Sequence, residues 1–177
     1  QLELQREILA RILDKSGVPC AAGEFLSIVK ELGLILDLDR AVVTQTLAYL
    51  AQNPNCQPLT INLSTAAVRN RGFQDWLVSE VDGIGNLNIE LNEVSVLNNL
   101  DVVARFRDRI NKAGPGFGVD NFGIHPSGFS YLYKLQPDYV KIDGALISEI
   151  DRNAEDRFFV SSLITVAHSL EIKAYAE

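Results

Sequence analysis

The chain has 177 residues, of which 47% are hydrophobic and 22% are charged, with a formal net charge of -7. This composition suits one globular domain with a sizeable core, and the acidic balance disfavours broad binding to nucleic acid, which needs a basic surface. No apolar run reaches the roughly 18 residues of a membrane span. Cys20 and Cys56 lie outside any C-x-x-C pattern, so we expect reduced thiols in a cytoplasmic protein.

The N-terminal segment allows two interpretations. Residues 2–13 fit a helix by their period, and residues 6–12 fit a strand equally well. If these residues form one strand, Glu7 and Arg11 point to the same side, because an even number of residues separates them.

Further along the chain, helical periods alternate with short apolar runs. Helices are predicted over residues 24–35, 38–51, 65–79, 96–114 and 155–170, and strands over residues 59–63, 87–91, 117–120, 138–142 and 172–176. Ser64 can cap the helix that follows it. The last helix has one apolar face, formed by Phe159, Leu163, Val166, Ala167 and Leu170.

Alternating strands and helices are typical of parallel βα units. Their order alone fits either an open doubly wound sheet or a (β/α) barrel. The G-x-G-x-x-G phosphate loop that would favour the open sheet is absent from the sequence. Polar residues instead fall at or near the C-terminal ends of successive predicted strands, where a barrel gathers its chemistry: Asn62, Glu90, Asp120, Lys141 and Glu177.

These carboxylates, with an amide and a lysine, form a set of hard oxygen ligands. Such a set suits Mg²⁺, Mn²⁺ or Ca²⁺ better than zinc or copper, and two such metals can hold both oxygens of a phosphodiester cleavage. Lys141 could orient a water or neutralise developing charge. Glu7 is a further candidate ligand, and Arg11 could hold a phosphate.

Each residue also has a structural interpretation when taken alone. Asp143, before Gly144, fits a turn or a helix cap, and Asn62 fits a turn. His125 and His168 are interpreted as structural, and Trp76 as part of a core face with neighbouring Phe73 and Leu77. The joint pattern favours a site, because packing alone gives no reason for polar residues at successive strand ends.

The motifs resemble, in order and spacing, those of EAL domains, the bacterial cyclic-di-GMP phosphodiesterases and their inactive relatives. The resemblance covers essentially the whole chain. The matching stretches are EILAR at 7–11, INLS at 61–64, IELNE at 89–93, VDNFG at 119–123, VKID at 140–143 and AE at 176–177.

The resemblance implies a modified TIM (β/α) barrel that binds cyclic di-GMP at its strand ends. Active members use two Mg²⁺ or Mn²⁺ ions, for which Ca²⁺ can substitute, and release linear pGpG. Lys141 then matches the lysine near the catalytic water, Glu7 a catalytic metal ligand, and Arg11, Leu9 and Asp143 contacts to the dinucleotide. The implied metal ligands are Glu7, Asn62, Glu90, Asp120 and Glu177. The family's last strands would follow residue 177, so we expect residues 1–177 to be a single EAL-like domain, truncated at its C-terminus.

Three departures bear on activity. The first motif reads Glu-Ile-Leu instead of Glu-Ala-Leu, and Asn121 replaces the second acid of an Asp-Asp pair. The loop IHPSGF at 124–129 lacks the usual side chains, and its Pro126 stiffens it. These changes favour a degenerate receptor with weak or no hydrolysis, in which the metals are weakened or lost. An active phosphodiesterase and a nucleotide-free interaction module are the alternatives, so the question of enzyme activity stays open.

Residues 138–172 look similar to the EAL domain of the LapD type of inner-membrane receptor. The resemblance to EAL domains implies a homodimer and a larger signalling protein with an upstream GGDEF or sensor domain. The resemblance to LapD implies a position in the cytoplasmic part of an inner-membrane protein. The domain itself is expected to be soluble and to bind no nucleic acid duplex.

Overall fold

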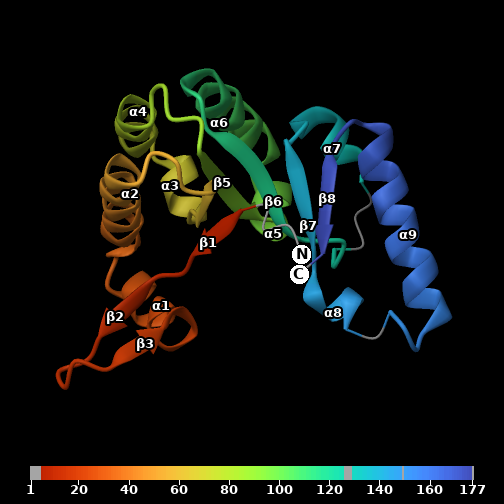
Figure 1. The fold of residues 1–177 in the computed structure, drawn as a ribbon, viewed down its shortest axis with the longest axis horizontal. Helices are drawn as coiled ribbons and strands as arrows, with labels where there is room; N and C mark the ends of the chain where they lie inside the picture. The colour runs from red at the N-terminus through yellow and green to blue at the C-terminus, as the bar shows by residue number, and fades with distance from the viewer. Residues whose placement is uncertain (1–4, 126–128, 149, 177) are drawn as a thin grey trace. The chain divides into compact units, whose positions relative to one another are not determined.

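A computed structural model describes residues 5–125, 129–148 and 150–176 of the chain (Figure 1). The chain divides into two compact units. The first comprises Gln1–Asn88 and Ala113–Pro115, and the second comprises Ile89–Lys112 and Gly116–Glu177.

The first unit combines a parallel strand pair, an antiparallel hairpin and several helices. Strand β1 (Arg6–Ile8) pairs in parallel with β4 (Leu59–Asn62). Strand β2 (Arg11–Leu13) pairs antiparallel with β3 (Pro19–Ala21). The helices are α1 (Ala22–Glu31), α2 (Ile35–Gln52), α3 (Thr65–Arg69) and α4 (Arg71–Glu80).

The N-terminal segment is neither one helix nor one strand. It breaks after Ile8, and the chain then enters the β2–β3 hairpin, whose tip is held by Asp14. The Asp14 carboxylate accepts hydrogen bonds from the backbone N–H groups of Ser16 and Val18, at 2.7 and 2.9 Å. Glu7 and Arg11 therefore lie on strands of different sheets. They do not share one strand face, because residues 6–12 do not form a single strand.

The predicted helix over residues 65–79 is two helices that meet at Asn70. Ser64 Oγ accepts from the N–H of Ala67 at 3.2 Å, which confirms the predicted cap of α3. Asn70 Oδ1 accepts from the N–H of Phe73 at 2.8 Å and so starts α4 as a new helix. Phe73 is buried as predicted, and Trp76 is half-buried with the Arg40 guanidinium 4.0 Å from its ring centroid.

The second unit is built on parallel strands. Strand β5 (Leu87–Asn92) begins in the first unit and continues in the second, where it is followed by β6 (Gly116–Phe122), β7 (Tyr139–Ile142) and β8 (Lys173–Ala176). Strand β7 pairs in parallel with both β6 and β8. Within this unit, hydrogen bonding orders the strands β5-β6-β7-β8. The helices are α5 (Glu93–Asn98), α6 (Leu100–Ala113), α7 (Ser130–Leu135), α8 (Gly144–Ile147) and α9 (Ala154–Ser169).

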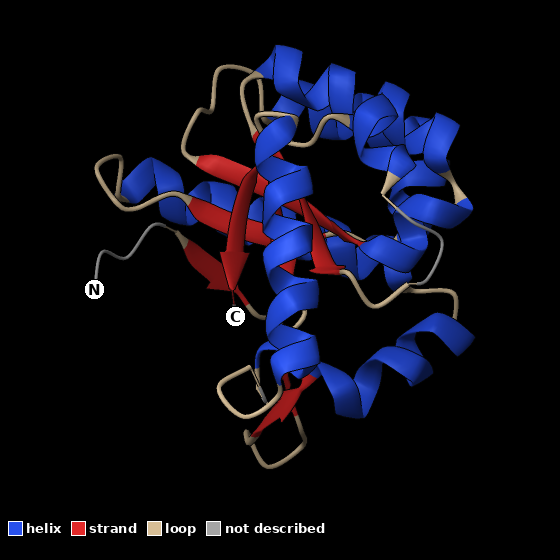
Figure 2. Ribbon diagram, turned by 90° about the vertical axis from the view of Figure 1, so that its right-hand side faces the viewer, coloured by secondary structure: helices blue, strands red, loops and turns tan. Residues whose placement is uncertain are grey.

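The helices of this unit differ from the prediction in detail. The expected helix over residues 96–114 is interrupted at Asn99, so that α5 and α6 are separate. Helix α9 packs against β8 (Figure 2), and its buried residues are Val160, Leu163 and Ala167. Phe159, which was predicted on this face, is 39% exposed, so the buried face is rotated toward Val160.

The predicted α/β class with a parallel sheet is confirmed. Cys20 and Cys56 are free thiols. None of the helices in the described ranges combines the length and the apolar character that a membrane-crossing helix needs.

Candidate functional site

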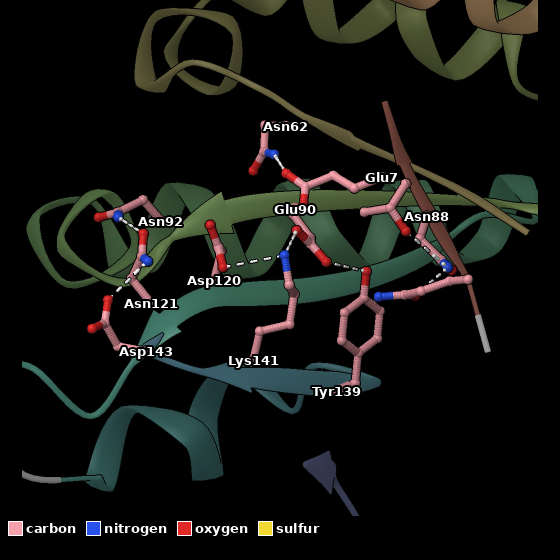
Figure 3. A network of polar contacts seen from close by, with 12 residues as sticks. Glu7, Asn62, Asn88, Glu90, Asn92, Asp120, Asn121, Tyr139, Lys141 and Asp143 are labelled. Atoms are coloured by element: carbon pink, nitrogen blue, oxygen red, sulfur yellow. Dashed lines mark hydrogen bonds and ion pairs between the residues drawn. The ribbon is translucent and has the colours of Figure 1, made fainter. Parts of the chain in front are cut away.

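Three strands of the second unit bring Glu90, Asp120 and Lys141 together (Figure 3). Lys141 Nζ lies 3.2 Å from Glu90 Oε2 and 3.4 Å from Asp120 Oδ1. These are the side chains that the sequence places near successive strand ends. Because parallel strands end at the same edge of a sheet, the parallel pairing of β6 with β7 places Asp120 and Lys141 at one edge.

Burial dominates the electrostatics of Glu90, whose side chain is 0% exposed. Loss of water raises the pKa of Glu90 to about 7, although the Lys141 ammonium and the Tyr139 hydroxyl both lower it. The Tyr139 hydroxyl donates to Glu90 Oε1 at 2.8 Å. The negative charge of Glu90 therefore depends on a nearby cation, which Lys141 supplies.

The chemistry of this group fits a hard divalent cation. Asp120 Oδ1 is buried and accepts no hydrogen bond from the described residues, although it pairs by charge with Lys141. Two carboxylates thus converge on a point that already attracts a positive charge. Across the described ranges, however, no three His, Cys, Asp or Glu side chains form a group that could hold a metal ion. The carboxylates of Glu90 and Asp120 are therefore a partial ligand set.

Asn121 lies at an irregularity of β6, where the register with β7 shifts between Val119 and Phe122. Its φ is 54°, a left-handed conformation that asparagine adopts more readily than most residues. Asn121 Oδ1 accepts from Asn92 at 2.7 Å, and its Nδ2 donates to Asp143 Oδ2 at 2.9 Å (Figure 3). The other oxygen of Asp143 accepts from the N–H of Ala145 at 2.8 Å and caps α8, which confirms the helix-cap interpretation.

The first unit holds two predicted site residues that contact each other. Asn62 donates to Glu7 Oε1 at 2.6 Å, and both side chains are exposed. Arg11 is also exposed and donates to the carbonyl of Ala10 at 3.0 Å, while Leu9 is 58% exposed. Glu177 lies outside the described residues.

The sequence matches the EAL domain family over residues 3–177. The chain belongs to the EAL domain family. A curated relative, the cyclic di-GMP phosphodiesterase PdeA of Borreliella burgdorferi, is 25% identical over 97% of this chain and 27% of its own length. Another, PdeB of Shewanella oneidensis, is 26% identical over 97% of this chain and 21% of its own length. The EAL chain thus spans about a quarter of these relatives.

Solved EAL structures have the same fold. The Vibrio cholerae LapD S helix-GGDEF-EAL structure, bound to c-di-GMP, matches with a TM-score of 0.88 and 26% identity, over 98% of this chain and 43% of that chain. The FimX EAL domain of Pseudomonas aeruginosa, also bound to c-di-GMP, matches with a TM-score of 0.90 and 23% identity, over 97% and 72% of the two chains. These matches confirm the predicted EAL-type fold.

Glu93 is a buried polar residue of this EAL domain for which no role is predicted from the sequence. It is 2% exposed at the start of α5. Its carboxylate accepts from the Tyr131 hydroxyl at 2.8 Å and from the backbone N–H groups of Gly123 and His125, both at 3.2 Å. Burial and the Glu93 carboxylate raise the pKa of Tyr131. Glu93 thereby ties the segment after β6 to α5 and α7.

The sequence contained only part of the signal for this role. Glu93 falls within the IELNE stretch, but its partners lie at least 30 residues away along the chain. Pro126, which is predicted to stiffen the same loop, lies outside the described residues.

Proposed function

We propose that this EAL domain binds cyclic di-GMP as a signalling receptor, with weak or no hydrolysis of the ligand. The EAL neighbours LapD and FimX, which are bound to c-di-GMP, support the ligand. The observation that carries the receptor assignment is the double hydrogen bond of Asn121 to Asn92 and Asp143.

Asn121 stands where the resemblance places the second acid of an Asp-Asp pair. Its amide is neutral and donates to Asp143, which a carboxylate cannot do unless it is protonated. The position therefore contributes no negative charge toward a second metal. Weaker binding of that metal removes a stabiliser of the attacking or leaving oxygen and slows phosphodiester cleavage.

In this proposal Glu90 and Asp120 help to hold one divalent cation, Mg²⁺ or Mn²⁺, with Ca²⁺ as a substitute. The cation would supply positive charge to the ligand's phosphates. Lys141 lies beside both carboxylates and offsets part of their negative charge when no metal is bound. The metal roles of Glu7, Asn62 and Glu177, and the ligand contacts of Leu9, Arg11 and Asp143, stay predictions. So do the homodimer, the upstream GGDEF domain and the cytoplasmic location.

An active phosphodiesterase is the second candidate. It is favoured by the close group of Glu90, Asp120 and Lys141, which keeps the acids and the lysine of an active site. The two candidates differ in one outcome, the fate of the bound dinucleotide.

Hydrolysis and binding measured on the same sample separate them. The purified full-length protein is incubated with cyclic di-GMP and Mg²⁺ or Mn²⁺, nucleotides are resolved by chromatography, and binding is measured by calorimetry in Ca²⁺. Binding with an intact ligand supports the receptor. Accumulation of pGpG that stops in the Glu7→Ala variant establishes the phosphodiesterase instead. Absence of binding overturns both and leaves the interaction module.

A further inference from the structure

Strand β7 begins with a buried tyrosine that reaches the candidate site. Tyr139 is 3% exposed, and its hydroxyl donates to Glu90 Oε1 at 2.8 Å. Tyr139 and Lys141 are two residues apart on one strand, so both side chains lie on the same face. Figure 3 shows both reaching the Glu90 carboxylate, Tyr139 at one oxygen and Lys141 at the other.

The tyrosine ring fits because its neighbour on β6 is glycine. Gly118 and Tyr139 are register partners in the parallel pair. A Cβ atom on residue 118 would lie 2.4 Å from ring atoms Cε2 and Cζ of Tyr139, closer than carbon atoms pack. The φ of Gly118 is not positive, so the glycine is needed here for space and not for backbone conformation.

Tyr139 and Lys141 hold Glu90 in different ways. Lys141 is a cation on a flexible stem, and a metal ion at Glu90 and Asp120 would compete with it. The Tyr139 hydroxyl is neutral, and its ring is confined by Gly118 and packs against Tyr175 with ring centroids 5.4 Å apart. Tyr139 can therefore keep Glu90 in place while Lys141 moves away.

We propose that Tyr139, seated against Gly118, is a positioning residue that orients the Glu90 carboxylate for a divalent cation. This inference rests on the proposed function, in which Glu90 helps to hold the metal. Groups that hydrogen-bond to a metal ligand orient it, and their removal typically lowers metal affinity about 10- to 100-fold.

The test is a Mn²⁺ titration of the full-length protein, read from the electron paramagnetic resonance signal of free Mn²⁺. We expect Tyr139→Phe to raise the dissociation constant about 10-fold or more. Tyr175→Phe is the matched control, because it removes a hydroxyl from the ring that packs against Tyr139, and it should leave the constant unchanged. An unchanged constant in Tyr139→Phe overturns the inference.

A metal-free measurement separates this inference from the proposed function. In protein labelled with ¹³C-glutamate, the side-chain carboxyl resonance of Glu90 is assigned through Glu90→Gln and followed at a fixed alkaline pH. Tyr139→Phe should shift it, and Tyr175→Phe should not. If the wild-type protein binds no Mn²⁺ but Tyr139→Phe still shifts the resonance, the proposed metal binding is refuted while the contact of Tyr139 with Glu90 is supported. If the resonance does not move, the inference is overturned whatever the metal does.

Gly118 provides an independent arm. Gly118→Ala should displace the Tyr139 ring and weaken Mn²⁺ binding as Tyr139→Phe does. In a Tyr139→Ala background, where the ring is gone, Gly118→Ala should cause no further loss of affinity. A Gly118→Ala variant that binds Mn²⁺ like the wild type would refute the role of Gly118 in placing the Tyr139 ring. Thermal unfolding shows whether each variant is folded.

Discussion

The side-chain amide of Asn121 donates a hydrogen bond to the Asp143 carboxylate over 2.9 Å. The amide oxygen accepts from Asn92 at 2.7 Å, so both polar ends of Asn121 have a partner. Asp143 in turn caps α8 through the N–H of Ala145. The amide is therefore part of the hydrogen bonding that joins β5, β6 and the start of α8. An acid at this position would place two carboxylates against each other.

Replacing Asn121 by aspartate should lower the stability of the domain and raise its hydrolytic activity. Without metal, Asn121→Asp should lower the free energy of unfolding by about 1–3 kcal/mol, because it removes the donor to Asp143. Added Mn²⁺ should reduce this loss, and hydrolysis of cyclic di-GMP should exceed that of the wild type. Urea unfolding with and without Mn²⁺, and chromatography of pGpG, measure both effects. Asn121→Gly is the control, because it keeps the left-handed φ without adding charge and should gain no hydrolysis. Equal stability of Asn121→Asp and the wild type in chelator would contradict the account.

Removal of Lys141 should destabilise the metal-free domain. Its side chain is 7% exposed and that of Glu90 is 0% exposed, so Lys141→Met leaves the buried Glu90 carboxylate without a cation. Loss of one partner from a buried pair costs about 3–5 kcal/mol. Mn²⁺ should stabilise the variant more than the wild type, because the ion need not displace the lysine. Urea unfolding with and without Mn²⁺ measures the difference.

Lys134→Met is the matched control for this variant. Lys134 pairs with Asp101 at the surface, where the side chains are 54% and 70% exposed. An exposed pair contributes little to stability because water screens its charges, and Mn²⁺ should stabilise this variant no more than it stabilises the wild type. If both lysine variants lose equal stability, the buried group is not what Lys141 stabilises.

Replacing Glu93 by glutamine should lower the free energy of unfolding less than replacing it by alanine. Glu93→Ala leaves the Tyr131 hydroxyl and the backbone N–H groups of Gly123 and His125 without their acceptor, at a cost of roughly 3 kcal/mol or more. Glu93→Gln can turn its NH₂ toward Tyr131, whose hydroxyl then accepts, at a cost of about 1 kcal/mol. Adding Tyr131→Phe to Glu93→Gln should remove that compensation. Urea unfolding of the single and double variants tests the cycle, and equal losses in the Ala and Gln variants would contradict it.

Asp39 should make stability depend on acid pH. The residue is 5% exposed, and burial raises its pKa from 3.8 to about 6, although hydrogen bonds from Ser64 lower it. Since the folded state binds the proton more tightly than the unfolded state, this contribution is fully present below the unfolded pKa of 3.8 and is lost as pH rises through about 6. The loss is roughly 3 kcal/mol.

Unfolding free energies across this pH range, compared between the wild type and Asp39→Asn, measure the effect of the carboxyl. The free energy of unfolding of Asp39→Asn should rise relative to that of the wild type as pH rises from 3.8 to about 6. The Ser64 hydroxyl donates to Asp39 Oδ2 at 2.5 Å and lowers the pKa of Asp39. Ser64→Ala should therefore extend the loss of stability to higher pH. Parallel curves for the wild type and Asp39→Asn would show that the carboxyl does not titrate in this range.

Local pattern was sufficient for several elements. The apolar runs at 59–63, 87–91 and 138–142 became β4, β5 and β7 with ends that differ by one residue, because buried strands are bounded by turn-forming and polar residues. Pattern failed where a side chain restarts a helix, as Asn70 does between α3 and α4. It also missed the β2–β3 hairpin, whose strands are each three residues long and mostly exposed.

The sequence by itself determined the family and the types of residue at successive strand ends, because these depend on the order and spacing of motifs along the chain. Only the tertiary structure decided which groups meet. The ring of Tyr139 lies against Gly118 on the neighbouring strand, and Glu93 accepts from Tyr131, which is 38 residues away. Such contacts depend on strand register and on the space left by packed side chains. Those two properties arise when segments far apart in the chain fold against one another, and local periodicity does not encode them.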